Sequence, residues 1–238
     1  MKKIILLLAL LGLSSAYPAM ALGLDGVNDQ TKALMALAKE GDAQAQYDLA
    51  LNYDYGEDGL PVDHAEAVKW YSKAAEQGHK DAQYNLAVSY DDGEGVAEDD
   101  EKAVFWYRKS AEQGDASAQY NLAKSYDDGE GVGVDHAAAV EWYRKAAEQG
   151  HSKAQYNLAV SYDEGEGVRQ DHVKAVEWYL KAAKEGHPEA QYNLAVSYEI
   201  GEGVEKNKSE AIKWYRRAAA QGDTDAVESL KEMGAWEE

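Results

Sequence analysis

The chain has 238 residues, with 24 Lys and Arg against 44 Asp and Glu, a formal net charge of −20 at pH 7, and no Cys. Without Cys it has no disulfide framework, no thiolate nucleophile and no Cys-ligated zinc or iron–sulfur site. So large a negative charge repels nucleic-acid phosphates and anionic lipid headgroups, and neither is therefore an expected partner. The apolar fraction of 45% is ordinary for a globular protein and too high for a disordered chain.

The first residues predict an export signal. Lys2 and Lys3 form a basic start, residues 4–13 are almost entirely apolar, and small residues precede a cleavage point after Ala21. This order is typical of a secretory signal peptide. The apolar stretch is also shorter than the roughly 20 residues that a membrane-spanning helix needs. We therefore expect residues 1–21 to be removed and the rest to be exported, to the periplasm or beyond the cell, with no membrane insertion after cleavage.

The remaining chain is repetitive. A Trp-Tyr pair recurs at intervals of 36 residues, at Trp70-Tyr71, Trp106-Tyr107, Trp142-Tyr143, Trp178-Tyr179 and Trp214-Tyr215. Gln-Tyr-Asx-Leu-Ala recurs at 46–50, 83–87, 119–123, 155–159 and 191–195, and Gly-Glu-Gly-Val at 93–96, 129–132, 165–168 and 201–204. A fixed period of this length indicates stacked supersecondary units.

Each unit is predicted to contain two helices. Ala82 and Leu86 share one face of the first helix, and Ala103 and Tyr107 share one face of the second. Residues suited to N-caps precede the second helices at Asp63, Asp99, Asp135, Asp171 and Asn207. Glycines suited to a left-handed C-terminal position end the first helices at Gly93, Gly129, Gly165 and Gly201.

The two ends of the chain complete the pattern. Residues 22–41 are expected to hold an N-terminal segment and a capping helix, and residues 223–238 a C-terminal capping helix and tail. Between them, residues 42–222 form five units of 36–37 residues. The predicted fold is therefore an all-α solenoid of about 12 helices, closed at both ends by half-units.

This sequence resembles the Sel1-like repeats, which are relatives of tetratricopeptide repeats. The resemblance rests on Gly-Glu-Gly-Val in the loop and on Ala-Val-x-Trp-Tyr-x-Lys-Ala-Ala-x-x-Gly in the second helix, and it covers about residues 30–238. It implies a right-handed α/α superhelix whose concave face is lined by first helices. The chain departs from the family by carrying Asn-Leu-Ala where many copies have Leu-Gly. It also lacks the two Cys per repeat of the branch linked to β-lactam binding, so that activity is not carried over.

The sequence predicts no catalytic residue, no cofactor and no metal site. It contains none of the motifs G-x-S-x-G, S-x-x-K, H-E-x-x-H or a P-loop. The six histidines occupy two repeat positions, both at helix starts, and alternate there with Asp, so we expect solvated terminal residues: His64, His136 and His172, and His79, His151 and His187. Paired acids such as Asp91-Asp92 do not fit a calcium-loop pattern and predict a solvated acidic edge.

The resemblance places a candidate binding surface on the first helices, off the core stripe. Its predicted residues are Tyr84, Tyr120, Tyr156 and Tyr192, then Asn85, Asn121, Asn157 and Asn193, then Lys124, and finally Asp91, Asp127 and Asp163. Tyr gives contact area at little entropic cost, and Asn can hold a peptide backbone without reading its sequence. The acids would favour a basic partner. Alternatively, the Asn side chains join adjacent units.

Several functions are compatible with these features. The first is a non-enzymatic scaffold of the bacterial envelope that binds a protein or peptide, possibly basic, through a concave face lined by Tyr, Asn and acids. The second is a periplasmic immunity protein that neutralises a toxic effector. A hydrolase acting on cell-wall material or a β-lactam is a further alternative, although no motif supports it. A host-directed secreted factor is the last.

Overall fold

The structure, a computed structural model, describes residues 27–236, so the predicted signal peptide lies outside the described residues. The described part contains twelve α-helices and no strands. They are α2 (Asp29–Glu40), α3 (Ala43–Tyr55), α4 (His64–Glu76), α5 (Lys80–Asp92), α6 (Asp100–Glu112), α7 (Ala116–Asp128), α8 (His136–Glu148), α9 (Ser152–Glu164), α10 (His172–Lys184), α11 (Pro188–Ile200), α12 (Lys208–Ala219) and α13 (Thr224–Glu232). The predicted all-α class and helix number are confirmed.

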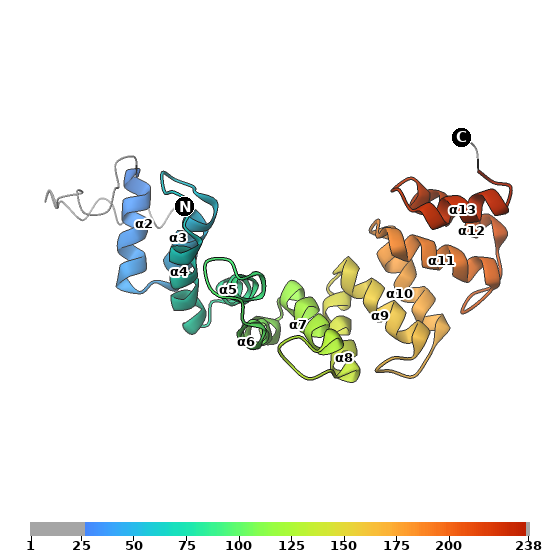
Figure 1. The fold of residues 1–238 in the computed structure, drawn as a ribbon, viewed down its shortest axis with the longest axis horizontal. Coiled ribbons are helices and arrows are strands. Elements are labelled where there is room, and N and C mark those ends of the chain that lie inside the picture. The colour runs from blue at the N-terminus through green and yellow to red at the C-terminus, as the bar shows by residue number, and fades with distance from the viewer. Residues whose placement is uncertain (1–26, 237–238) are drawn as a thin grey trace, which may run out of the picture.

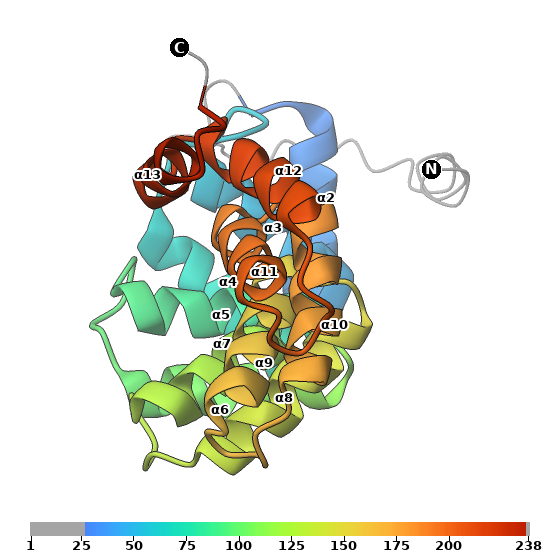
Figure 2. The same ribbon diagram turned by 90° about the vertical axis from the view of Figure 1, so that its right-hand side faces the viewer.

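The helices stack into an elongated arc whose two ends rise towards the same side (Figure 1). Substantial helix–helix contacts join only helices that are neighbours in the chain. Viewed along the stack, successive units are rotated relative to one another, so the stack coils (Figure 2). This nearest-neighbour architecture is that of a repeat solenoid. Within the described residues, no helix is both long and apolar enough to cross a membrane.

Two side chains per unit fill the core. The Tyr of each Trp-Tyr pair on the second helix and the Leu of each Gln-Tyr-Asx-Leu-Ala segment on the first helix are at most 1% exposed. They are Tyr71, Tyr107, Tyr143, Tyr179 and Tyr215, and Leu49, Leu86, Leu122, Leu158 and Leu194. Small Ala residues surround them and let the helices approach closely, as the spacing of apolar residues predicts.

The helix ends use the predicted caps. Asp63 and its equivalents in the other four units each accept a hydrogen bond from a backbone N–H in the first turn of the second helix. Gly93 and its equivalents end α5, α7, α9 and α11 in the left-handed conformation. Each unit therefore begins and ends its helices through its own residues.

The second glycine of Gly-Glu-Gly-Val allows one repeat to touch the next. A Cβ atom at Gly131 would collide with the backbone of Asp100, the first residue of α6 in the preceding unit. Gly95, Gly167 and Gly203 meet His64, His136 and His172 in the same way. The loop thereby brings its Glu against the start of the preceding second helix.

A glutamine ladder also crosses each boundary. The first residue of every Gln-Tyr-Asx-Leu-Ala segment is buried, and its Nε2 donates to a carbonyl near the end of the preceding second helix, as Gln83 does to Ala75 at 3.0 Å. Its Oε1 accepts from a Gln at the end of its own unit's second helix, as in Gln113 to Gln83 at 2.7 Å. In the fourth unit Glu185 replaces that donor, and Gln155 Oε1 has no partner.

Candidate functional site

The four predicted tyrosines of the first helices lie in one row and are half-buried. Each ring packs against the fully buried Tyr of the same unit's second helix, with centroids 6.0 Å apart for Tyr84 and Tyr107. Tyr120 and Tyr156 also stack on histidines of the following unit, His151 and His187, at 4.7 Å. The rings are therefore held in fixed orientations, with only part of each surface open to solvent.

The row continues along each first helix at four-residue intervals, because residues i and i+4 share a helix face. The next positions are Val88, Lys124, Val160 and Val196, and the last are Asp92, Asp128, Glu164 and Ile200. The last positions are all exposed. We call these twelve residues, from Tyr84, Tyr120, Tyr156 and Tyr192 onward, the first-helix row. A shallow hollow between Tyr120 and Tyr156 is lined further by Lys153, Asn157 and Glu189.

The predicted asparagines lie beside the row and reach the preceding unit. Asn193 Nδ2 donates to the Tyr179 hydroxyl at 3.2 Å. The equivalent pairs are Asn85 with Tyr71, Asn121 with Tyr107 and Asn157 with Tyr143. Burial raises the pKa of each phenol, and the hydrogen bond with the amide offsets part of that rise. Contacts between adjacent units are therefore one role of these side chains, the alternative that the sequence leaves open.

The predicted acids Asp91, Asp127 and Asp163 each contact a core tyrosine. Each accepts a hydrogen bond from a buried hydroxyl, at 2.9 Å from Tyr107, 3.3 Å from Tyr143 and 3.3 Å from Tyr179. Burial of the ring, and to a smaller extent the neighbouring carboxylate, raise the pKa of the Tyr107 and Tyr179 hydroxyls well above the usual range of tyrosine. Asp127 and Asp163 are half-buried, so the expectation of a solvated acidic edge is wrong for these two residues. Asp91 is exposed, as are the second acids Asp92 and Asp128.

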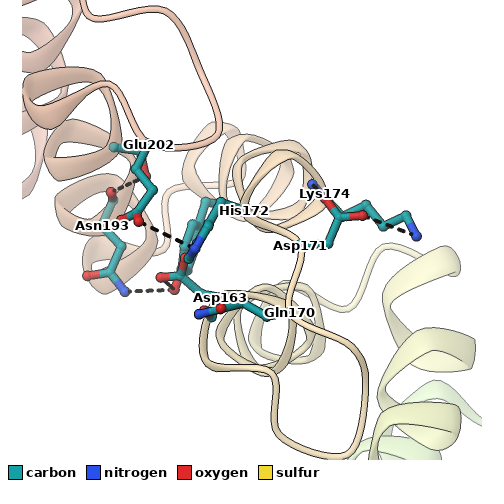
Figure 3. Close-up of polar contacts among 9 residues, drawn as sticks. Asp163, Gln170, Asp171, His172, Lys174, Asn193 and Glu202 are labelled. Atoms are coloured by element: carbon teal, nitrogen blue, oxygen red, sulfur yellow. Dashed lines mark hydrogen bonds and ion pairs between the residues drawn. The ribbon is translucent and has the colours of Figure 1, made fainter.

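Histidines at the start of second helices complete a polar group at three unit boundaries. Figure 3 shows the group around His172. His172 Nδ1 lies 2.7 Å from Asp163 Oδ1, and its Nε2 lies 3.3 Å from Glu202 Oε1 in the loop of the next unit. The sets Asp54, His64, Glu94 and Asp127, His136, Glu166 repeat this arrangement. We call each set an Asp–His–Glu clasp. These rings are half-buried and paired, not freely solvated as the sequence suggested.

One boundary lacks the histidine. Asp100 takes its place at the start of α6, facing the loop that carries Glu130. In the same unit as Glu130, Lys124 replaces the Val of the first-helix row, and its Nζ lies 3.0 Å from Asp128 and 3.2 Å from Glu130. Lys124 therefore places a positive charge beside Glu130 at the boundary where no histidine is present.

The clasp around His172 has the residue types of a metal site. Asp163, His172 and Glu202 bring three ligand-type atoms within 4.8 Å of one another. However, both ring nitrogens of His172 already face carboxylate oxygens, one on each side. A ring used as a donor on both sides has no lone pair to offer a metal. We therefore interpret the cluster as paired charges.

The repeat pattern now has a structural counterpart in every unit. The family model for the Sel1 repeat matches residues 43–79, 80–115, 116–151, 152–187 and 188–223. This chain belongs to the Sel1 repeat family. Sel1 repeats generally serve as interaction scaffolds for proteins. No curated protein matches the sequence.

Solved structures of Sel1 repeat proteins share the fold. A protective antigen of uropathogenic Escherichia coli with this fold is 41% identical, with a TM-score of 0.81, over 87% of this chain and 44% of that one. The chain thus spans less than half the length of that relative. A Sel1 repeat protein from Oxalobacter formigenes is 33% identical, with a TM-score of 0.73, over 85% of this chain and 87% of that one.

Sequence analysis missed the Glu of the Gly-Glu-Gly-Val loop, which closes the Asp–His–Glu clasps of these Sel1 repeats. A signal for it was present. Asp100 and Lys124 are both departures from the repeat, and they fall on the two sides of the same unit boundary. Two simultaneous departures that change charge in opposite directions suggest that the positions are related, but only the structure shows that Lys124 pairs with Glu130.

Proposed function

We propose that this Sel1 repeat protein is a non-enzymatic interaction module of the bacterial envelope, which binds a basic protein or peptide along the first-helix row. The observation that carries the proposal is the row itself. The same type of half-buried Tyr recurs at one position in successive units, followed by an exposed acid in three of them.

The physical chemistry of the row suits an extended partner. Tyr rings fixed by their neighbours lose little conformational freedom on binding, so their contact area contributes more fully to affinity. The exposed acids Asp92, Asp128 and Glu164 add to a chain whose net charge is −20. A negative surface of this kind speeds association with a basic partner and makes it sensitive to salt.

The experiment is a capture from an envelope extract with residues 22–238 as bait, at about 50 mM and about 200 mM salt, between which the Debye length shortens appreciably. The test variant carries Asp92→Lys and Glu164→Lys, both exposed and on the first-helix row. We expect one dominant partner that the test variant no longer retains.

A matched control carries Glu112→Lys and Glu148→Lys, which are exposed on the second helices α6 and α8. It changes the net charge equally but at a different face. Retention of the partner by the control and loss by the test variant supports the proposal. Equal loss from both variants would show that net charge alone governs binding and would contradict a role for the row.

Export is part of the proposal and has its own measurement. The full-length chain should be recovered from the periplasmic fraction, shortened after Ala21, as terminal sequencing would show. A chain that stays in the cytoplasm with residues 1–21 attached would contradict the envelope location. If the captured partner is a toxic effector, the module is an immunity protein.

A further inference from the structure

The three Asp–His–Glu clasps share a geometry that fixes a protonation state. In each one, Nδ1 lies 2.7–2.9 Å from an Asp of the same unit, and Nε2 lies 3.2–3.3 Å from a Glu of the next unit. A carboxylate only accepts hydrogen bonds, and a neutral imidazole carries a single N–H. Only the doubly protonated ring satisfies both neighbours.

We propose that His64, His136 and His172 are proton-dependent clasps that hold each following repeat against the preceding one. With the ring protonated, both carboxylates are bound and the loop of the next unit is fixed on the second helix. When the ring loses a proton, one nitrogen and one carboxylate face each other as two acceptors, and the contact weakens.

The groups around each ring favour the charged form. His172 faces Asp163 from α9, Glu202 from the loop after α11, and the N-cap Asp171 from its own helix start. Asp163 is further bound by the Tyr179 hydroxyl, and Lys174 pairs with Asp171 at 3.4 Å. The surroundings of His64 are Asp54, Glu94 and Asp63, and those of His136 are Asp127, Glu166 and Asp135.

The direction of the pH effect follows from these contacts. The hydrogen bond to Asp raises the pKa of all three histidines above 6.5, against the opposing effect of burial. A raised pKa in the folded protein means that the clasp is complete below about pH 6.5, the unfolded value, and is lost as the pH rises through the folded value.

Two other histidines make stability depend on pH in the opposite direction to the clasps. Burial lowers the pKa of His151 and His187, which stack on Tyr120 and Tyr156. Their contribution to stability is lost as the pH falls, so it partly cancels that of the clasps in any measurement on the whole molecule. The clasps must therefore be measured site by site.

The boundary between the second and third units is an internal control. There Asp100 replaces the histidine, and Glu130 pairs with Lys124 of its own unit. A lysine stays protonated throughout the neutral range. The loop at this boundary should therefore keep its contacts unchanged at a pH where the other three loosen. Because each unit contacts only its neighbours, loosening a clasp changes the angle between two units and with it the shape of the first-helix row.

The test is a site-resolved NMR titration of the histidine rings, combined with hydrogen exchange, on the whole chain. We expect titration midpoints above 6.5 for the clasp histidines. Between pH 6 and pH 8 the protection factors of residues 93–96, 165–168 and 201–204 should fall several-fold, while those of residues 129–132 stay constant. Midpoints at or below 6.5, or equal changes in all four loops, would overturn the proposal.

Two variants test the geometry directly. Glu202→Gln should lower the midpoint of His172 and leave that of His64 unchanged, because only the former loses a carboxylate. Asp100→His combined with Lys124→Val should create a fourth clasp, so that protection of residues 129–132 becomes pH-dependent. If the double variant folds and these residues remain insensitive to pH, the histidine is not the proton-dependent element.

Discussion

At the scale of single residues, one polar side chain per unit forms a hydrogen bond with a tyrosine of the core. Asp91 lies on the first helix and accepts the hydroxyl of Tyr107, whose ring is 1% exposed. A buried phenol needs a hydrogen-bond partner, and the carboxylate supplies it without itself being fully buried. The recurrence of the acid therefore has a packing reason, whether or not a partner uses it.

The variant Tyr107→Phe tests this contact. It removes the hydroxyl and keeps the ring, so we expect the free energy of unfolding to fall by about 1.5–3 kcal/mol, the scale of a hydrogen bond to a charged group. Urea unfolding followed by circular dichroism measures it. Tyr55→Phe is the control, because Tyr55 is 65% exposed and should change little. Equal effects of the two variants would contradict a structural role for the Tyr107 hydroxyl.

Sequence alone could place the buried Tyr and Leu but could not assign the polar residues beside them. Apolar spacing determines which face of a helix is buried, so Tyr71 and Leu86 are predicted from period alone. By contrast, the partner of His172 includes Glu202, which lies 30 residues away in the next unit. Such a contact depends on how two units pack, and the spacing within one unit does not contain that information.

At the scale of the elements, close contact between a loop and a helix depends on one glycine. Gly131 and Gly114 both have positive φ, 65° and 88°, so both are strained when replaced. A Cβ at Gly131 would collide with the backbone of α6, whereas a Cβ at Gly114 would meet nothing within 4 Å. Replacing Gly114 therefore introduces backbone strain alone, whereas replacing Gly131 introduces the same strain and a steric collision.

Gly114→Ala should destabilise the protein by about 1–2 kcal/mol, the cost of a left-handed residue with a side chain. Gly131→Ala should cost at least about 1 kcal/mol more, because the loop must also move away from the preceding unit. Thermal or urea unfolding of the two variants side by side gives the difference. Equal costs would show that the loop does not need its close approach.

The glutamine ladder offers a stabilising change. Gln155 Oε1 is buried without a partner, because Glu185 stands where the other units have Gln at 77, 113, 149 and 221. Glu185→Gln should restore the donor and raise the free energy of unfolding by about 1 kcal/mol. The reciprocal Gln149→Glu should lower it by a similar amount. If neither variant changes the free energy of unfolding, the glutamine ladder does not contribute to stability.

At the scale of the whole molecule, the sequence predicts the architecture well because the architecture is a repeat. The capping residues and the spacing of the buried apolar residues are all contained within one unit. Because the unit is repeated, they also determine how the whole chain stacks. The capping helices α2 and α13 were predicted in the same way, from partial matches to the unit. The coiling of the stack in Figure 2 depends instead on contacts across unit boundaries, such as the Asp–His–Glu clasps, and needed the structure.

Matching contacts at each boundary hold successive repeats together, and deletion of whole repeats tests this most directly. Removing residues 152–187 joins His151 to Pro188, reproducing the natural His187-Pro188 junction. It places His136 against Glu202 and removes Glu185. Removing residues 116–151 instead places Asp100 against Glu166 and discards Lys124. The two deletions have the same length and leave the same number of units, so they differ in the match at the new boundary and in whether the unpaired Gln155 acceptor is removed.

The measurement is the free energy of unfolding of both shortened chains in urea at pH 6, with helix content from far-ultraviolet circular dichroism. We predict that both remain helical and that the chain lacking residues 152–187 is the more stable, by about 1–3 kcal/mol, through its restored ion pair and the loss of one unpaired buried acceptor. Equal stabilities, or a chain lacking 152–187 that fails to fold, would contradict the claim.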